Sequence, residues 1–248
     1  MAQITIAELV RNGTMSAEMA AVLWAAVDEQ VSFLTVAMPR FAGKTTTSLA
    51  VLALRSPDVP VHWVDGHPEL MARLKQERRG GYLAVPEFDY APMPGYIWGP
   101  PVRRVFETLS AGYSLQTSLH ASSVDDAIRE ITHGNGVSDE LASTFKLVLY
   151  IERFGSTYAT LWRRLVDLYE VQGVEDGRPI GRSLFRWQRD ADRFEKLSDP
   201  CQFGRDSADL EHRAAVIGDL ARGGRTSAAD VAEVVQAYRN RRHSQAGV

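Results

Sequence analysis

The chain has 248 residues, a formal net charge of -3, 45% apolar residues and 24% charged residues. Its length allows one α/β domain, or one domain with a small appendage, and argues against two large domains. The composition is that of an ordinary globular protein, and the charge gives no reason to expect nucleic acid as a partner, although residues 239–243 are locally basic.

The first part of the chain predicts a helical segment over residues 1–30. Thr5 is suited to cap a helix over 6–11, and Asn12-Gly13 interrupts this helix. A second helix is expected to open at Ser16 and to run to Gln30, and residues such as Trp24 give it an apolar side.

The middle of the chain alternates strands and helices, which is the pattern of a parallel sheet. The expected strands span 31–37, 59–64, 82–87 and 113–120. The expected helices span 45–54, 68–78, 101–109, 124–131 and 137–145, and a loop rich in Pro and Gly covers 91–101.

The character of the chain then changes to β-rich segments separated by turn residues. Strands are expected over 146–154, 158–172 and 183–188, as antiparallel hairpins that extend the sheet. Two amphipathic helices over 207–221 and 227–242 follow. We therefore divide the chain into an N-terminal helical segment (1–30), a core with a β-rich extension (31–200) and a C-terminal helical segment (201–248).

The most informative motif is Gly43-Lys44-Thr45, which follows an apolar strand and precedes a helix. Such a sequence in such a context is typical of a phosphate-binding loop. We expect residues 42–46, that is Ala42, Gly43, Lys44, Thr45 and Thr46, to bind ATP. Lys44 would reach the β- and γ-phosphates, and the Thr45 hydroxyl would be a ligand of Mg²⁺ at a helix N-terminus that favours anions.

The motif matches the full phosphate-loop pattern only in its second half. Met38 stands where the first glycine is expected, and Pro39, Arg40 and Phe41 replace small residues in the loop. Pro39 lacks a backbone donor, and Met38 and Phe41 are expected to crowd the phosphates, so weaker or altered nucleotide binding is one expectation. An ordinary helix N-terminus that contains Gly-Lys is the alternative interpretation.

Polar residues follow the other predicted strands as well. Ligands of open α/β sheets bind at the carboxyl ends of the strands, where Asp65, Glu87 and His120 are expected beside Lys44 and Thr45. Glu87 would hold Mg²⁺ or orient the attacking water, and His120 would donate to a phosphate oxygen. Asp65 is equally suited to hold a second water or metal ion and to form a turn before a helix. The alternative for Glu87 is an acid that is only solvated in a loop, and the alternative for His120 is a structural role.

The order of these features resembles the ATPases that power type II and type IV secretion systems and type IV pili. It comprises the phosphate loop, an acidic segment, a strand ending in Glu87 and the sequence Thr117-Ser118-Leu119-His120-Ala121. The basic pair Arg163-Arg164, the run from Glu170 to Gly173 and Leu184-Phe185-Arg186-Trp187 are similar to the C-terminal β segment of that family. The resemblance covers most of residues 5–190.

The resemblance implies an α/β fold of the P-loop NTPase (RecA-like) class, with a parallel sheet core, an antiparallel β extension and C-terminal helices. It implies that Glu87 is the Walker B acid, that Asp65 and Glu69 form the acidic box, and that His120 is the histidine-box residue. The implied cofactors are ATP and Mg²⁺. The implied assembly is a homo-oligomeric ring, a hexamer in that family, in which ATP hydrolysis drives pilus assembly or secretion.

The sequence also departs from the family pattern. Phe88-Asp89-Tyr90 after Glu87 lacks the usual arginine, and the acidic box has an irregular spacing. About thirty residues precede the core strand, where the family has an N-terminal domain. A separate polypeptide is expected to replace that domain, or the motor is reduced. The arginines that would reach the phosphate of a neighbouring subunit are Arg73, Arg78, Arg79, Arg103 and Arg104, and the sequence does not choose among them.

A reducing compartment fits the single Cys201, which excludes an intramolecular disulfide. The sequence begins without the pattern of a signal peptide and contains no run of about 18 apolar residues. We therefore expect a cytoplasmic protein, which other components would bring to the inner face of the cell membrane if it works there.

The leading hypothesis is an ATP-hydrolysing motor subunit of a secretion or pilus machine, with an inner-membrane platform or secretion components as partners. The alternative is a nucleotide-binding scaffold or regulatory subunit of such a ring, with weakened catalysis. A small-molecule kinase is disfavoured because it leaves the C-terminal β segment unexplained and the sequence shows no lid of clustered arginines.

Overall fold

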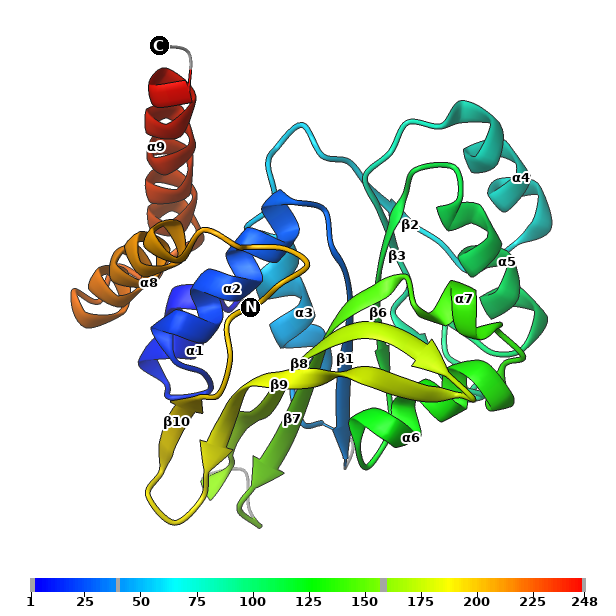
Figure 1. Ribbon diagram of the computed structural model, residues 1–248, viewed down its shortest axis with the longest axis horizontal. Helices are drawn as coiled ribbons and strands as arrows, with labels where there is room; N and C mark the ends of the chain where they lie inside the picture. The colour runs from blue at the N-terminus through cyan, green and yellow to red at the C-terminus, as the bar shows by residue number, and fades with distance from the viewer. Residues whose placement is uncertain (1–2, 39–40, 157–159, 247–248) are drawn as a thin grey trace.

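The computed structural model describes residues 3–38, 41–156 and 160–246, and its strands form one ten-stranded mixed sheet (Figure 1). The strand order is β10-β9-β8-β7-β1-β6-β3-β2, and the short strands β4 and β5 lie off this path. The strands are β1 (Ser32–Met38), β2 (Val61–Trp63), β3 (Tyr82–Ala84), β4 (Glu87–Phe88), β5 (Tyr96–Ile97), β6 (Ser114–Leu119), β7 (Phe145–Phe154), β8 (Trp162–Glu175), β9 (Arg178–Gln188) and β10 (Arg193–Lys196).

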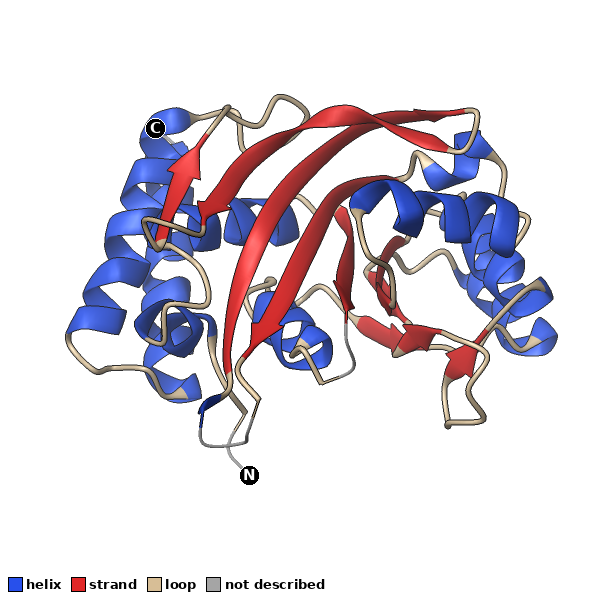
Figure 2. Cartoon of the chain, turned by 90° about the horizontal axis from the view of Figure 1, so that it is seen from below, coloured by secondary structure: helices blue, strands red, loops and turns tan. Residues whose placement is uncertain are grey.

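Helices cover both faces of this sheet (Figure 2). They are α1 (Ile6–Arg11), α2 (Ala17–Asp28), α3 (Lys44–Leu52), α4 (Pro68–Glu77), α5 (Pro100–Leu109), α6 (Val124–Arg129), the π-helix η1 (Glu130–Gly134), α7 (Asp139–Ala142), α8 (Ser207–Arg222) and α9 (Ala228–Ala246). The side chains of Thr5 and Ser16 accept hydrogen bonds from backbone N–H groups of the first turns of α1 and α2, as the capping signals predict.

The sheet has two parts with different strand directions. Strands β7, β1, β6, β3 and β2 are parallel, and β8, β9 and β10 extend the sheet by antiparallel pairing from β7. This topology confirms the predicted fold class, an α/β fold with a parallel core, an antiparallel β extension and C-terminal helices.

Strand β1 lies in the middle of the parallel part and is buried on both faces. Its alternate side chains enter two hydrophobic clusters, with Phe33 and Ala37 in one and Leu34 and Val36 in the other. A strand covered on both faces is continuously apolar, which is why the run at 31–37 could be recognised.

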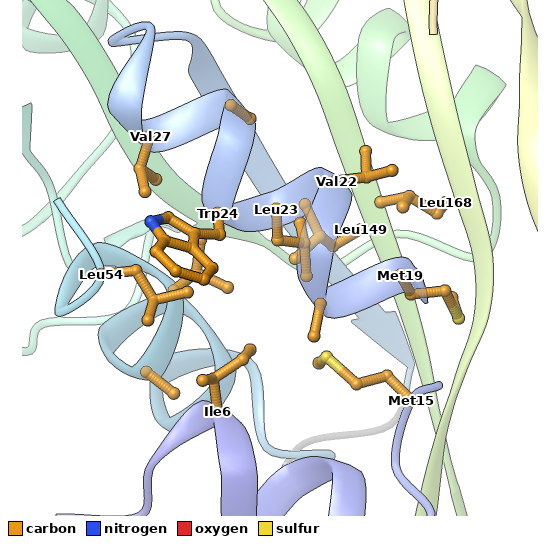
Figure 3. Close-up of a cluster of buried hydrophobic side chains, with 14 of the residues drawn as sticks. Ile6, Met15, Met19, Val22, Leu23, Trp24, Val27, Leu54, Leu149 and Leu168 are labelled. Atoms are coloured by element: carbon orange, nitrogen blue, oxygen red, sulfur yellow. The ribbon is translucent and has the colours of Figure 1, made fainter. Parts of the chain in front are cut away.

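The first cluster joins the sheet to helices from both ends of the chain. In Figure 3, Leu23 of α2 lies beside Leu149 of β7, Val22 lies beside Leu168 of β8, and Trp24 lies on the other side of α2 near Leu54. The Trp24 ring also lies 4.8 Å from the ring of Tyr238 in α9, measured between centroids. Helices α1, α2, α3, α8 and α9 thus share one core on this face.

The second cluster lies on the opposite face, under α4, α5, α6 and α7; Figure 1 shows α4, α5 and α7 at the right of the sheet and α6 below it. Phe106 of α5 packs edge-on against Phe145 of β7, with 5.6 Å between the ring centroids. The sheet is therefore the middle layer of three.

The structure corrects several predicted boundaries. The strand expected over 82–87 is broken into β3 and β4, because Pro86 has no N–H to donate to a neighbouring strand. The loop over 91–101 contains the short strand β5, which pairs with β4. The helix expected over 137–145 is shortened to α7, and Phe145 instead begins β7, where its ring is fully buried.

The β-rich part is longer than predicted. Strand β9 begins at Arg178, five residues before the expected start at 183, and β10 is an additional strand. A two-residue turn joins β8 to β9, with φ of 50° at Asp176 and 69° at Gly177, as a tight hairpin requires. The expected start of a strand at 158 lies outside the described residues.

Within the described chain, no helix combines the length and the apolar character needed to cross a membrane.

Candidate functional site

The phosphate loop leads from β1 into α3, as its sequence predicts. Gly43 is the residue before the helix and adopts φ of 96°, a left-handed conformation that favours glycine. Helix α3 begins at Lys44, so the first N–H groups of the helix lie at this loop. Thr45 is exposed and Thr46 is half-buried in the first turn.

The replaced residues of the loop have different places. The Met38 side chain is 46% exposed and that of Phe41 is 77% exposed, so neither is packed into the protein. Phe41 also has φ of 64°, which is uncommon for a residue with a Cβ. Pro39 and Arg40 lie outside the described residues, and the crowding of the phosphates by this loop stays a prediction.

Lys44, Glu87 and His120 come together in one cluster. The Lys44 Nζ atom lies 2.9 Å from Glu87 Oε1 and 2.9 Å from His120 Nε2. His120 Nε2 in turn lies 3.1 Å from Glu87 Oε1, and its Nδ1 lies 3.3 Å from the backbone oxygen of Ala37. The side chains of Lys44 and Glu87 are 6% and 5% exposed, so this ion pair is buried.

The strand register explains why these residues meet. Val36 near the end of β1 is paired with Leu119 at the end of β6, and Phe88 of β4 is paired with the same Leu119. Glu87 directly precedes Phe88, and His120 directly follows Leu119. The pairing of β1, β6 and β4 at this edge of the sheet therefore brings both side chains close to Lys44.

Asp89 adds a third ligand to this edge of the sheet. One ligand atom each of Glu87, Asp89 and His120 lie within 4.8 Å of one another. Two carboxylates and an imidazole are donors that suit a divalent cation such as Mn²⁺ or Mg²⁺. Asp89 also accepts a hydrogen bond from the N–H of Ala91 at 2.9 Å. In the sequence Asp89 stood out only because it occupies a segment where an arginine is expected.

Asp65 lies apart from this cluster. It follows β2 at the edge of the sheet, is exposed and accepts a hydrogen bond from the N–H of His67 at 3.0 Å, immediately before α4. Glu69 is exposed in the first turn of α4. The structure therefore gives Asp65 the geometry of a turn before a helix, and catalytic roles for Asp65 and Glu69 stay predictions.

The five arginines considered as phosphate-contacting residues lie on α4, just after it, or on α5. Arg103 and Arg104 donate to the backbone oxygens of Asn135 and Gly66, each at 2.7 Å. Arg73 and Arg79 are exposed and lie near Glu77, and Arg78 ends α4 in a left-handed conformation. Arg103 and Arg104 thus donate to backbone oxygens. Arg73, Arg78 and Arg79 are exposed on α4 or just after it.

Another arginine, Arg163, contacts the phosphate loop directly. Its Nη2 donates to the backbone oxygen of Phe41 at 3.2 Å. A Cβ on Gly43 would lie 2.9 Å from Arg163 Cδ and 3.1 Å from its Nε, so the side chain passes over the glycine. The sequence marked Arg163 only as part of a basic pair, and no local pattern revealed that β8 would bring it to the loop.

No family model matches this chain. The chain is 26% identical over 212 residues to Uncharacterized protein MJ0900 of Methanocaldococcus jannaschii, an alignment that covers 77% of this chain and 38% of the relative. Among solved structures, it is similar to the VirB11 ATPase from the Brucella suis type IV secretion system, with a TM-score of 0.44 and 14% identity over 62% of this chain and 52% of that chain. The chain thus spans well under two thirds of the length of both proteins.

Proposed function

We propose that this chain binds ATP with Mg²⁺ at the phosphate loop and hydrolyses it as a motor subunit of a type II/IV secretion or type IV pilus system. The observation that carries the proposal is the meeting of Lys44, Glu87 and His120 at the carboxyl ends of adjacent strands. The sequence resemblance to the secretion ATPases gives these three residues their roles.

In the proposed mechanism, Lys44 leaves Glu87 and donates to the β- and γ-phosphates, while the first N–H groups of α3 bind the same oxygens. Thr45 and Glu87 would hold Mg²⁺, with Asp89 close enough to contribute a further oxygen. Bound Mg²⁺ would neutralise the charge that develops on the phosphate oxygens.

Freed from Lys44, the Glu87 carboxylate would accept a hydrogen bond from the attacking water and align it with the γ-phosphorus. His120 lies beside both groups and would donate to a γ-phosphate oxygen, so that it responds to the loss of that phosphate. Rigid-body motion between the nucleotide states would then do mechanical work in a ring, a hexamer by family resemblance. An inner-membrane platform or other secretion components, and a separate polypeptide in place of an N-terminal domain, are the proposed partners.

A second candidate function is a nucleotide-binding scaffold or regulatory subunit of such a ring. It is favoured by Met38 in place of a loop glycine and by the buried Lys44–Glu87 pair, which keeps both groups engaged with each other. In this case the chain assembles and binds nucleotide but does not hydrolyse it.

The test is Mg-ATP hydrolysis by the purified protein at several concentrations, with particle size measured in the same samples. Lys44→Ala and Glu87→Gln are the site variants, and Glu107→Gln, at an exposed acid of α5, is the matched control. Turnover that rises with assembly, disappears in the site variants and persists in the control supports the motor. Stable assembly without turnover in the wild-type protein supports the scaffold instead.

A further inference from the structure

We propose that Arg163 is a phosphate-binding residue of this site, supplied by the same chain through β8. The inference rests on the proposed function, because it deepens how the phosphate loop recognises its anion. Arg163 would be a second cation at this site beside Lys44, and through it the β extension would take a direct part in nucleotide binding.

The first observation is the position of the Arg163 side chain. It passes over Gly43, and Nη2 donates to the Phe41 oxygen, so the guanidinium lies along the loop where anions are expected. Lys44 is directed toward Glu87 and His120 from the next position in the chain. Two cations therefore lie at the phosphate loop, Lys44 at the start of α3 and Arg163 near the start of β8.

The second observation is charge balance. Arg163 is half-buried and makes no ion pair with a carboxylate anywhere in the described chain, and its buried Nε has no hydrogen-bond partner there. The adjacent Arg164, by contrast, binds both oxygens of Asp192, at 2.9 Å each. A partly buried guanidinium without a counter-ion is costly, and a bound phosphate would supply the missing negative charge.

The chemistry of the group fits this role. A guanidinium has five N–H donors in a planar fork that matches phosphate oxygens, and the bond to Phe41 uses a single donor. A short rotation at the end of the side chain would direct Nε and a second nitrogen to a phosphate while the contact with the loop is kept. The competing interpretation is that Arg163 only holds the loop in shape.

Binding of inorganic tripolyphosphate and of Mg-ATP to the full chain tests the proposal, by calorimetry over a range of salt concentrations. Wild-type protein is compared with Arg163→Gln, Arg163→Lys, Lys44→Ala and the matched control Arg164→Gln, whose arginine already has a carboxylate partner. Thermal unfolding without ligand is measured for every variant.

We expect Arg163→Gln to weaken tripolyphosphate binding about 10- to 100-fold, the range of one or two charge-assisted hydrogen bonds, and to make affinity less sensitive to salt. Arg163→Lys should recover part of the affinity, and Arg164→Gln should bind as the wild type does. A role in loop shape alone would change unfolding without changing the salt dependence.

The outcomes separate the two proposals. If the wild-type protein binds neither probe, the proposed function and this inference both fail. If the wild type binds, Lys44→Ala does not, and Arg163→Gln binds with wild-type affinity and salt dependence, the inference about Arg163 is wrong while the proposed function stands.

Discussion

Lys44 and Glu87 form a buried ion pair, so at the scale of single residues the proposed nucleotide binding is an exchange of partners. The ammonium group lies 2.9 Å from the carboxylate, and both side chains are almost fully excluded from water. Within a medium of low dielectric such a pair is held strongly, and each member is costly to leave alone. If the proposed function holds, phosphate competes with Glu87 for Lys44.

The first prediction concerns this exchange. Glu87→Gln removes the competing charge, so we expect the variant to bind ADP more tightly than the wild type when Mg²⁺, which Glu87 is proposed to hold, is left out, while hydrolysis of Mg-ATP is lost. Isothermal titration calorimetry measures the affinity. Equal or weaker binding in a folded Glu87→Gln variant would contradict the exchange.

The second prediction concerns stability without ligand. Lys44→Met leaves the Glu87 carboxylate buried without its ammonium partner, and we expect a loss of about 3 kcal/mol in the free energy of unfolding. Adding Glu87→Gln to this variant should restore part of the loss, because the unpaired charge is removed. Denaturant unfolding measures both. Additive losses in the double variant would show that the pair is not coupled.

The third prediction concerns Gly43. Gly43→Ala places a Cβ at φ of 96° and 2.9 Å from Arg163 Cδ, so we expect a loss of about 1–2 kcal/mol from backbone strain and a displaced Arg163. In an Arg163→Ala background the steric part should disappear and the backbone part remain. A double-mutant cycle of unfolding free energies measures the coupling, and a coupling of zero would rule out the contact.

The residues of the site differ in how far the sequence predicts them. Lys44, Glu87 and His120 could be predicted because each lies close to the carboxyl end of a strand expected in the parallel sheet, and these ends share one edge of the sheet. Arg163 could not, because β8 runs antiparallel to β7 and brings its first residues, rather than its last, to this edge. Asp89 could not be placed because the expected strand is broken at Pro86, and the pattern of apolar residues does not show where the chain goes after that break.

At the scale of elements, local signals set most helices and strands, while pairing decides the rest. Caps at Thr5 and Ser16 define α1 and α2 from sequence alone. Strand β5 has two residues and forms because β4 lies beside it. Phe145 joins β7 because Ser32 of β1 is its partner in the parallel pairing. Such partners are far apart in sequence, so no local pattern contains them.

Helices α8 and α9 are joined by a cluster of charges around Asp209. Asp209 accepts hydrogen bonds from Tyr238 and Arg213 and an ion pair from Arg242. Burial acts to raise the pKa of Asp209, but the hydrogen bonds from Tyr238 and Arg213 outweigh it and hold the pKa below its usual value. Burial and the bond to Asp209 raise the pKa of Tyr238 to about 12.

The fourth prediction is the pH dependence of this cluster. Because the folded pKa of Asp209 is lowered, its stabilisation is present above the unfolded value of about 3.9 and is lost as pH falls through the folded pKa. Asp209→Asn should cost about 1–3 kcal/mol at neutral pH. The difference in Tm from wild type should shrink as the pH is lowered to about 3.

Asp219→Asn is the control for this experiment, because Asp219 pairs with Arg222 on the exposed side of the same helix. Its difference from wild type should be small throughout. A difference between Asp209→Asn and wild type that stays constant with pH would contradict the lowered pKa.

At the scale of the whole molecule, one hydrophobic cluster unites the sheet with helices from both ends of the chain. Leu149 of β7 and Ile217 of α8 are both fully buried in it. The molecule should therefore lose the C-terminal helices and the sheet in one transition.

The fifth prediction tests this unity. Ile217→Ala should lower the free energy of global unfolding by about 2–5 kcal/mol, as Leu149→Ala should in the sheet. The unfolding curves from circular dichroism and from tryptophan fluorescence should coincide in both variants. Early, separate melting of helical signal in Ile217→Ala would contradict a single cooperative core.

Contacts between the two ends of the chain also impose an order on its folding. Thr5 Oγ1 donates to the backbone oxygen of Thr226, 221 positions away, at 2.7 Å. Arg213 binds Asp28 at 2.6 Å across a similar span. The apolar sides of α1 and α2 leave the ribosome well before α8 and α9, with which they share a core. At roughly 5–20 residues per second they wait roughly 10–40 s for these helices. During that interval the nascent chain depends on chaperones, or on its partial core, to avoid aggregation.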